Sequence, residues 1–548
     1  MKMKIKFVLG LCLPLLLSSC NGYILSSETS TSTSTTTSTT SSTTTSTSST
    51  TTSTTTTVPT TVPTTTTIDG DGNIIADGKN ATLRKEETYW KVKSNGGVNT
   101  LDPVNAQDNI LVIPVAVNDF LGNATPKKLE EIKLTFSGDS TNTSWESVSS
   151  FYKKSSYGAC NLNFTITDWY TPNMNPKQIS AANNGESGGA NDGGTWSLLD
   201  KAVNWYKSNN PNVDMKKYDN DTDGFIDGVW LIYSCPNSSK FDYSRPKYSI
   251  PENSNGYWAF TFWNFKNSEK ANVASPAPYL YAWASYDFME EAFGEGGKDA
   301  HTYIHETGHM LGLDDYYDAS GNGAPYHPMG DIDMMDWNIG DHNSFTKYAL
   351  GWITPTLINS TATVKLSSLA DTGASILLKP ENYNNTPFDE YFMISLITPT
   401  NLNKQDYTIP YPPRDIGYTT PGIMITHIDA RGIRYSSSGS TLFEDNISKM
   451  EGTYGSNSEH VVNKGLICIF PQNYNSVSNS ARNPFSITFS SNNDVLFRAG
   501  QSFNLNEDSK FRKLMPSKSN KLNDDTTFNY SVAIESITAG VATIKITK

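Results

Sequence analysis

Two histidines four residues apart, His305 and His309, with Glu306 directly after the first, allow few local structures. Side chains four apart stack on one face of a helix, so both imidazoles can reach one metal ion if the segment is helical. We therefore predict a helix over residues 300–311 that holds zinc. Glu306 is turned partly toward the same ion, where it can accept a proton from water without being a ligand. The alternative, a chance match in a surface helix, is rare in a chain with seven histidines.

A catalytic zinc site needs a third protein ligand and one open position. In thermolysin-like enzymes that ligand is a glutamate farther along the chain, but no glutamate occurs between this motif and Glu381. Gly312 can instead end the helix in the left-handed conformation and return the chain toward the metal. Asp315 then occupies the ligand position, and Asp314 and Asp318 are close enough in sequence to replace it.

A methionine pair, Met334 and Met335, follows a loop rich in glycine and proline. The pair looks like the Met-turn that lies beneath the zinc in metzincins, a family of zinc proteases. The alternative is that these methionines fill gaps in a core. Four side chains nearby are chemically able to stabilise an oxyanion, and each also has a structural explanation: Tyr316, Tyr317, His342 and Tyr348.

A second group of carboxylates lies in residues 219–227, with aspartate at loop positions 1, 3, 5 and 9 and glycine at position 6. Calcium takes oxygen ligands at this density, and the glycine permits a sharp turn. Trp230 replaces the glutamate that an EF-hand has at position 12, so we predict a calcium loop of another kind. An acidic turn without metal is the alternative. The expected ligands are Asp219, Asp221, Asp223, Asp227 and the carbonyl oxygen of Phe225.

Residues 1–20 form a processing signal, with lysines at its start and an apolar run over 7–17 that is too short to span a bilayer. The run ends in small residues before Cys20, which resembles the lipobox of bacterial lipoproteins. We therefore expect Cys20 to be lipidated and to anchor an extracellular protein to the bacterial membrane. An ordinary secretory signal is the alternative, and in both cases the protein leaves the cytoplasm.

The remaining composition limits the other possibilities. Residues 26–67 are almost entirely serine and threonine, and residues 21–68 are predicted to be a disordered stalk. Residues 69–107 are polar and weakly patterned, which suggests a lead-in or a pro-segment. The formal net charge of −13 argues against nucleic-acid binding. The last three cysteines make no CxxC pair and are expected to be buried apolar residues: Cys160, Cys235 and Cys468.

The folded part divides into two regions by pattern. Residues 108–354 mix strands with helices, which predicts an α+β catalytic domain. Residues 355–548 contain short strands without helices, which predicts a β-sandwich or jelly-roll domain. In the first region we predict strands at 110–117, 161–169 and 228–233 and helices at 144–152 and 300–311. In the second we predict strands at 362–366, 375–378, 391–396, 422–428 and 465–470, and a hairpin of 531–537 with 541–546.

These pieces in this order resemble the immune inhibitor A family of secreted bacterial metalloproteases. The resembling segments are WESVSSFYKKSSYGACNLNFTITDW (145–169), YDNDTDGFIDGVWLIY (218–233), HETGHMLGLDDYYD (305–318), DHNSFTKYALGW (341–352) and PGIMITHID (421–429). The resemblance implies a metzincin-like zinc endopeptidase domain, bound calcium and a following β-sandwich. Asp314 stands where that family often has proline.

The expected activity is hydrolysis of internal peptide bonds in extracellular proteins, with zinc held by His305, His309 and Asp315 and with Glu306 as general base. The expected partners are protein or peptide substrates and the membrane, and the protein is expected to be monomeric. Two other functions remain open. One is a surface binding protein with an inactive protease-like domain, and the other is a zinc hydrolase that acts on an amide of cell-wall peptide.

Overall fold

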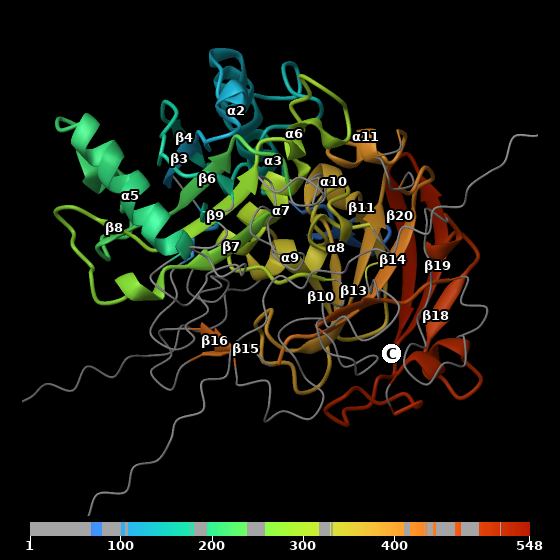
Figure 1. Ribbon diagram of the computed structural model, residues 1–548. Helices are drawn as coiled ribbons and strands as arrows, with labels where there is room; N and C mark the ends of the chain where they lie inside the picture. The colour runs from blue at the N-terminus through green and yellow to red at the C-terminus, as the bar shows by residue number, and fades with distance from the viewer. Residues whose placement is uncertain are drawn as a thin grey trace, which may run out of the picture. The chain divides into compact units, whose positions relative to one another are not determined.

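The computed structural model describes residues 67–78, 100–104, 108–176, 178–179, 194–237, 258–316, 329, 332–409, 411, 417–431, 433–435, 442–444, 466–472, 493–515 and 517–548 (Figure 1). Helices and strands are mixed along these residues, so the α+β class is confirmed. Every described residue belongs to one compact unit. No described helix has the length and apolarity needed to cross a bilayer. Cys20, almost all of the predicted stalk, Tyr317 and Asp318 lie outside the described residues.

A five-stranded sheet in the order β4-β3-β6-β9-β7 forms the first region. The first four strands pair in parallel, whereas β7 is antiparallel to β9 and lies at the edge. The central strands are apolar on both faces, as expected for a sheet that is covered on both sides. The strands are β3 (Asn109–Val115), β4 (Asn163–Ile166), β6 (Val229–Tyr233), β7 (Phe260–Trp263) and β9 (Leu280–Ser285).

Helices cover both faces of this sheet. One apolar cluster joins α2 (Pro126–Ser137), α3 (Val148–Ser155) and α7 (His301–Met310) to one face. A second cluster joins α5 (Gly194–Asn209) to the other face. The strand side chains alternate between the two clusters, so Val112 and Trp230 face α7 while Leu111 and Leu231 face α5. The sheet therefore supports α7 from one side, and α7 lies alongside β7 and β9 (Figure 1).

Two sheets pack over one apolar core in the second region, as expected for a β-sandwich. The first has the order β10-β12-β13-β14-β17, and the second has the order β1-β2-β11-β20-β19-β18. The predicted terminal hairpin is confirmed: Ala539 and Gly540 both have positive φ angles, as a type I′ turn requires. The strands are β10 (Thr356–Ile358), β11 (Ala362–Ser367), β12 (Ile376–Leu378), β13 (Glu390–Ile397), β14 (Gly422–Asp429), β17 (Ile467–Ile469), β18 (Ser502–Asn504), β19 (Ser531–Thr538) and β20 (Val541–Thr547).

Smaller elements complete the fold. Two-stranded sheets pair β5 (Phe225–Ile226) with β8 (Ala277–Pro278) and β15 (Ile433–Tyr435) with β16 (Leu442–Glu444). Short helices are α6 (Phe288–Glu291), α8 (Met334–Trp337), α9 (Ser344–Ala349), α10 (Leu369–Thr372) and α11 (Asn403–Asp406). The cluster beneath α7 also contains Leu377, Tyr391 and Met393 of the sandwich, so the two regions share a core.

The start of the described chain differs from the prediction that the disordered stalk extends to residue 68, and it gives structure to parts of the lead-in. β1 (Thr67–Ile68) and β2 (Ile74–Ala76) form a hairpin, and β2 pairs in parallel with β11 of the sandwich. Farther on, Leu101 is fully buried and its N–H donates to the carbonyl oxygen of Met310 at 2.8 Å. Both described stretches of residues 69–107 are therefore part of the fold. Removal of this whole segment as a pro-segment would take a strand from the sandwich and a contact from the end of α7.

Candidate metal centre

Helix α7 is almost completely buried, and only Thr302 among its ten residues is partly exposed. It ends as the sequence predicted. Gly312 has a φ of 92°, its N–H donates to His309 O at 2.9 Å, and the N–H of Leu313 donates to Gly308 O at 3.0 Å. This pair of bonds is a Schellman motif, which requires the left-handed glycine. The chain consequently turns back beneath the helix and brings the next residues to the histidines.

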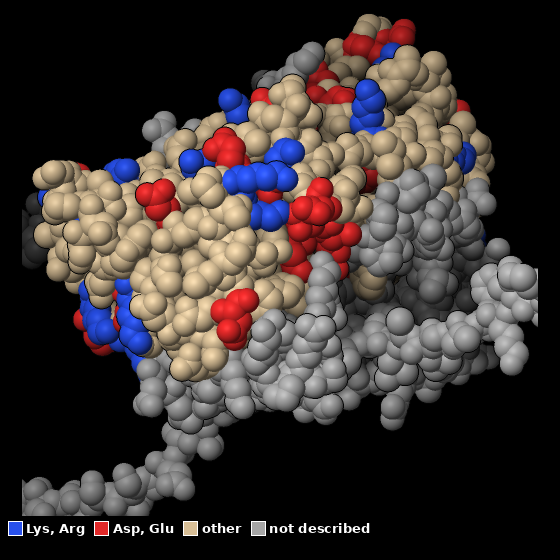
Figure 2. Space-filling model, turned by 45° about the horizontal axis from the view of Figure 1, so that its top comes forward, with Lys and Arg blue, Asp and Glu red and all other residues tan. Residues whose placement is uncertain are grey.

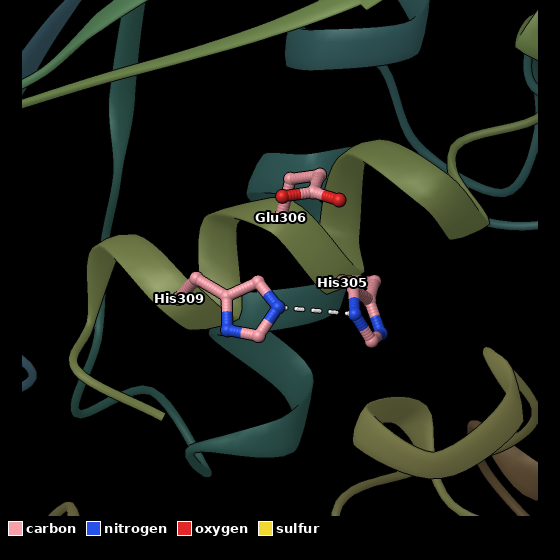
Figure 3. Close-up of side chains that lie close together, drawn as sticks. All are labelled: His305, Glu306 and His309. Carbon is pink, nitrogen blue, oxygen red and sulfur yellow. Dashed lines mark hydrogen bonds between the residues drawn. The ribbon is translucent and has the colours of Figure 1, made fainter. Parts of the chain in front are cut away.

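The predicted ligands converge on one point. Nε2 of His305 lies 3.0 Å from Oδ1 of Asp315 and 3.2 Å from Nε2 of His309. Nε2 of His309 lies 3.3 Å from the same carboxylate oxygen. Figure 3 shows the two imidazoles turned toward each other on one side of α7. In a tetrahedral zinc site, ligand atoms about 2.05 Å from the ion lie about 3.3 Å from each other, which matches all three separations.

The contacts of the two Nδ1 atoms explain why the Nε2 atoms of both histidines face the centre of the site. Nδ1 of His305 lies 2.9 Å from the carbonyl oxygen of Met334, and Nδ1 of His309 lies 2.7 Å from that of Leu313. A carbonyl oxygen only accepts, so each Nδ1 carries a proton and each neutral Nε2 presents a lone pair. Two lone pairs and a carboxylate oxygen then meet at one point. A cation or an added proton must lie among them, and the donor set suits zinc.

The charges of the centre agree with this reading. Burial by itself would lower the pKa of His309, but the carboxylate of Asp315 outweighs it and raises that pKa to about 10. Burial would raise the pKa of Asp315, but the two histidines outweigh it and hold the pKa below its usual value. Without metal, the cluster therefore retains a proton at neutral pH, which a metal ion must displace.

The structure brings Asp315 rather than Asp314 to the histidines. Asp315 is 8 % exposed and its carboxylate contacts both imidazoles, whereas Asp314 is only half-buried and no contact of it with either histidine occurs. Asp318 lies outside the described residues. Among the described aspartates, Asp315 is thus the one in a position to be the third ligand.

The methionine pair begins α8 and supports two of the three ligands. The carbonyl oxygen of Met334 accepts from His305, and that of Met335 accepts from the N–H of Tyr316 at 2.8 Å, next to Asp315. Asp333 holds this turn, because its carboxylate accepts from the N–H of Met335 at 2.9 Å. Adjacent carbonyls of one turn therefore orient His305 and the chain at Asp315 together.

Met335 is the methionine that lies directly against α7. A Cβ atom built on Gly308, between the two histidines, would be 2.6 Å from Sδ of Met335 and 3.1 Å from its Cε. Both residues are buried, so the helix can approach this turn only where it has no side chain. The sequence did not indicate which of the two methionines takes this place.

We expect Gly308→Ala to lower the free energy of unfolding by about 1–3 kcal/mol, because the new methyl group overlaps the Met335 thioether. In a Met335→Ala background the same change should instead raise the free energy of unfolding by up to about 1 kcal/mol, since alanine has a higher helix propensity than glycine. Urea unfolding of the four zinc-loaded proteins measures this coupling. Equal costs of the glycine change in both backgrounds would show that Met335 does not constrain α7.

Glu306 projects from a different side of α7 than the histidines (Figure 3). One oxygen atom of its carboxylate lies within 4.8 Å of the nitrogens of His305 and His309, close enough to share a bound water with an ion there. Burial raises the pKa of Glu306, although His309 and His305 oppose the change. The hydroxyl oxygen of Thr261 on β7 lies 3.2 Å from its Oε2. Glu306 is thus a desolvated carboxyl group beside the ligands, as a general base requires.

The candidate oxyanion donors are largely part of the core. The hydroxyl of Tyr316 is 2.6 Å from Oγ1 of Thr346, and that of Tyr348 is 2.9 Å from the hydroxyl of Tyr383. His342 is buried against aromatic rings, and burial lowers its pKa well below the usual value. Tyr317 lies outside the described residues. The structure therefore gives structural roles to Tyr316 and Tyr348 and assigns no oxyanion donor.

The first residue of α7 is a fully buried histidine, His301, held from four sides. Its Nδ1 lies 2.5 Å from Oδ1 of Asp299, and its Nε2 lies 3.2 Å from Oδ2 of Asp406 on α11. The rings of Trp145 and Tyr411 lie on it, each with a centroid distance of 4.1 Å. Burial would lower the pKa of His301, but the two aspartates outweigh it and raise the pKa to about 9. A cationic imidazole therefore joins the start of α7 to α11.

This contact predicts a pH dependence of stability. The folded protein keeps a proton on His301 up to about pH 9, whereas the unfolded chain loses it near the usual pKa of 6.5. The stabilisation is thus complete below pH 6.5 and is lost as the pH rises toward 9. We expect the urea midpoint of the zinc-loaded protein to fall over this interval, and to fall less in His301→Gln. Parallel curves for the two proteins would contradict the expectation.

The acidic loop forms a second cluster. One carboxylate oxygen from each of Asp219, Asp221 and Asp227 lies within 4.8 Å of the others. Asp219 is 4 % exposed, and its Oδ1 has no hydrogen-bond partner among the described residues. Burial, and next the charge of Asp108, raise the pKa of Asp227 to about 9. A buried carboxylate oxygen without a donor is costly, and a cation at this point would remove the cost.

Two other members of the predicted loop have different surroundings. Oδ1 of Asp223 accepts from the N–H of Phe225 at 2.8 Å, so this carboxylate supports the turn, and Phe225 begins β5. Gly224 has a φ of 89°, and a Cβ there would lie 2.5 Å from the N of Asn272, which confirms the need for glycine. The structure groups three of the four predicted aspartates around one point.

The three remaining cysteines, Cys160, Cys235 and Cys468, are all buried, as expected, and the structure shows no disulfide among them. Residues that the sequence did not single out are Thr261 and Asp108. The alternating FTFW segment was a signal for a strand at β7, but nothing in it shows that Thr261 faces Glu306. Comparison of the chain with known protein families and with curated proteins finds no match.

Proposed function

We propose that the protein is a zinc-dependent endopeptidase. One observation carries the proposal: the three separations of 3.0, 3.2 and 3.3 Å among His305, His309 and Asp315, which are those of tetrahedral zinc ligands. Three protein ligands leave the fourth position open, which distinguishes a catalytic zinc site from a structural one. One carboxylate oxygen of Glu306 lies within 4.8 Å of the nitrogens of His305 and His309, so Glu306 would be beside a bound ion without being needed as a ligand.

The mechanism follows from the placement of these groups. When bound, zinc would polarise the scissile carbonyl as a Lewis acid and would lower the pKa of a bound water to about 7. Glu306 accepts the proton of the attacking water, since its carboxyl group is desolvated and close to the ligands. The same carboxyl group then delivers the proton to the leaving amine. His305 and His309 keep their orientation throughout, because Met334 and Leu313 bind their outer nitrogens.

The edge strand β7 supports an extended peptide as substrate. The N–H of Asn264, which follows β7, donates to the carbonyl oxygen of Tyr279, which precedes β9, and in an antiparallel pair alternate residues bond to the same side. The backbone groups of Thr261 accordingly point away from β9. An edge strand can add a substrate strand through such groups, independently of the substrate sequence. We infer that protein segments in extended conformation bind beside α7.

The remaining proposals rest on the sequence. The Met-turn beneath α7 and the sandwich that follows agree with a metzincin-like domain of the immune inhibitor A type. Cys20 at the end of the signal implies a lipid anchor at the outer surface of a bacterial membrane. Substrates would then be extracellular proteins. On the face shown in Figure 2, basic groups lie next to acidic ones, a mixed charge that does not favour nucleic acid.

We propose calcium as the cation of the loop at 219–227, with Asp219, Asp221 and Asp227 as its ligands. A ligand that binds only the folded protein stabilises it by about 2.7 kcal/mol at a hundred times its Kd. We expect calcium to raise the melting temperature of the wild type but not of Asp219→Asn. Asp119→Asn, an equal change at an exposed site, should keep the full response. An unchanged wild-type melting temperature at millimolar calcium would refute the site.

The test of the main proposal uses the chain from Asn21 onward, without signal and lipid anchor, and its Glu306→Ala variant. Each digests unfolded casein, and zinc is measured in both. Cleavage by the wild type alone, with zinc in both proteins, supports the proposal and the role of Glu306. Absence of cleavage without bound zinc would favour a surface binding protein. Zinc binding without cleavage of casein, but with release of amines from cell-wall peptide, would favour an amidase.

A further inference from the structure

Thr261 is a buried hydroxyl on the strand that faces the catalytic helix. It lies on β7 opposite Ala282 of β9 and is 3 % exposed. Side chains of a strand alternate between its two faces. Phe260 and Phe262 join the cluster on the α5 side, whereas Trp263 packs in the cluster beneath α7. Thr261 shares the face of Trp263, which directs its hydroxyl to α7.

The hydroxyl makes two contacts with one residue. Oγ1 of Thr261 donates to the backbone oxygen of Glu306 at 2.7 Å and lies 3.2 Å from Oε2 of the same residue. Among the described residues, Thr261 is the only side chain within hydrogen-bond distance of this carboxyl group. A hydroxyl has one proton, which these two oxygen atoms share, and two lone pairs, which can accept from the carboxyl group when it is protonated.

We propose that Thr261 is a positioning residue that holds the Glu306 side chain in register with β7; the proposal rests on the proposed peptidase function. When Glu306 is a carboxylate, its Oε2 and its backbone oxygen share the one hydroxyl proton of Thr261. When Glu306 has taken the proton of the water, the hydroxyl can donate to the backbone oxygen and accept from the carboxyl group. The backbone of Thr261 points to the side of β7 on which no other described strand pairs, and a substrate strand would pair there. Thr261 would therefore fix the position of Glu306 relative to the peptide bond that Glu306 helps to cleave.

A neighbouring threonine provides a matched comparison. Thr307 also donates its hydroxyl to a backbone oxygen of α7, that of Tyr303, at 2.7 Å. Thr307 is fully buried as well, but it makes no contact with the Glu306 carboxyl group among the described residues. Loss of either hydroxyl removes one bond to the helix backbone. Only loss of the Thr261 hydroxyl also releases the base.

The experiment compares Thr261→Val, Thr261→Ser and Thr307→Val with the wild type, in the chain from Asn21 onward. For Thr261→Val we expect kcat on a fluorogenic peptide to fall about 10- to 100-fold, as for a catalytic group misplaced by about 1 Å. KM, zinc content and melting temperature should stay near the wild type. Thr261→Ser should restore kcat to within a few-fold, and Thr307→Val should retain it.

Crystal structures of the wild type and Thr261→Val provide a readout that does not depend on activity. We expect the Glu306 carboxyl group to leave its position only in the variant. An unmoved carboxyl group, an unchanged kcat, or a loss of zinc equal to the loss of kcat would each overturn the role of Thr261. If the wild type cleaves nothing, the peptidase proposal fails, while the two structures still decide whether Thr261 holds Glu306.

Discussion

Asp315→Ala should lose zinc and peptidase activity together. The variant keeps both histidines but has no carboxylate at the third corner of the site, which His305 and His309 now approach at 3.0 and 3.3 Å. Loss of an outer-shell partner of a zinc ligand costs about 10- to 100-fold in affinity, so loss of a ligand should cost more than about 100-fold. Competition with a chromophoric chelator measures the affinity, and metal analysis after gel filtration measures the zinc that remains.

Asp314→Ala is the matched control, since it removes the same group from the adjacent residue. We expect it to bind zinc and to cleave peptide as the wild type does, because Asp314 is half-buried and the carboxylate that contacts both histidines is that of Asp315. If instead Asp314→Ala loses zinc and Asp315→Ala keeps it, the assignment of the third ligand is reversed. Equal zinc affinity in both variants would mean that the ligand lies elsewhere in the chain.

The choice between these two aspartates shows where sequence reasoning ends. The histidine spacing and Gly312 predicted the helix, its end and the return of the chain, since each depends on local backbone geometry. Consecutive side chains beyond that turn point in different directions, and which of them meets the histidines depends on the turn that supports them. That support comes from Met335, whose carbonyl oxygen binds the N–H of Tyr316.

Contacts between elements that lie far apart in the chain also could not be predicted from the sequence. The strands β3 and β6 and the last hairpin were predicted because their apolar patterns are complete within each element. β2 has only three residues, and its partner β11 lies in the second half of the chain, so no local pattern reveals the pair. Thr261 could not be identified from the sequence either. It contacts Glu306 because β7 packs against α7, and no local pattern in the sequence shows this packing.

Lys347→Met should destabilise the protein by about 3–5 kcal/mol, the cost of leaving one partner of a buried ion pair alone. Lys347 on α9 is fully buried, and its Nζ lies 2.8 Å from Oδ2 of Asp341. The same ammonium donates to Ser155 at the end of α3 and lies over the ring of Tyr157. The pair therefore ties α3 to the loop between α8 and α9. Urea unfolding of the zinc-loaded protein measures the change in free energy.

The double variant Lys347→Met with Asp341→Asn separates the pair from simple packing. It removes the charge that the single change leaves unpaired in the core, so we expect it to be more stable than Lys347→Met alone. In the single variant Lys347→Met, the Asp341 carboxylate keeps two neutral donors among the described residues, the hydroxyl of Ser155 and the N–H of His342. If the second substitution lowers stability further, the stranded charge is not the cause of the loss. The long apolar stem of Lys347 and its contact with Tyr157 would then account for it.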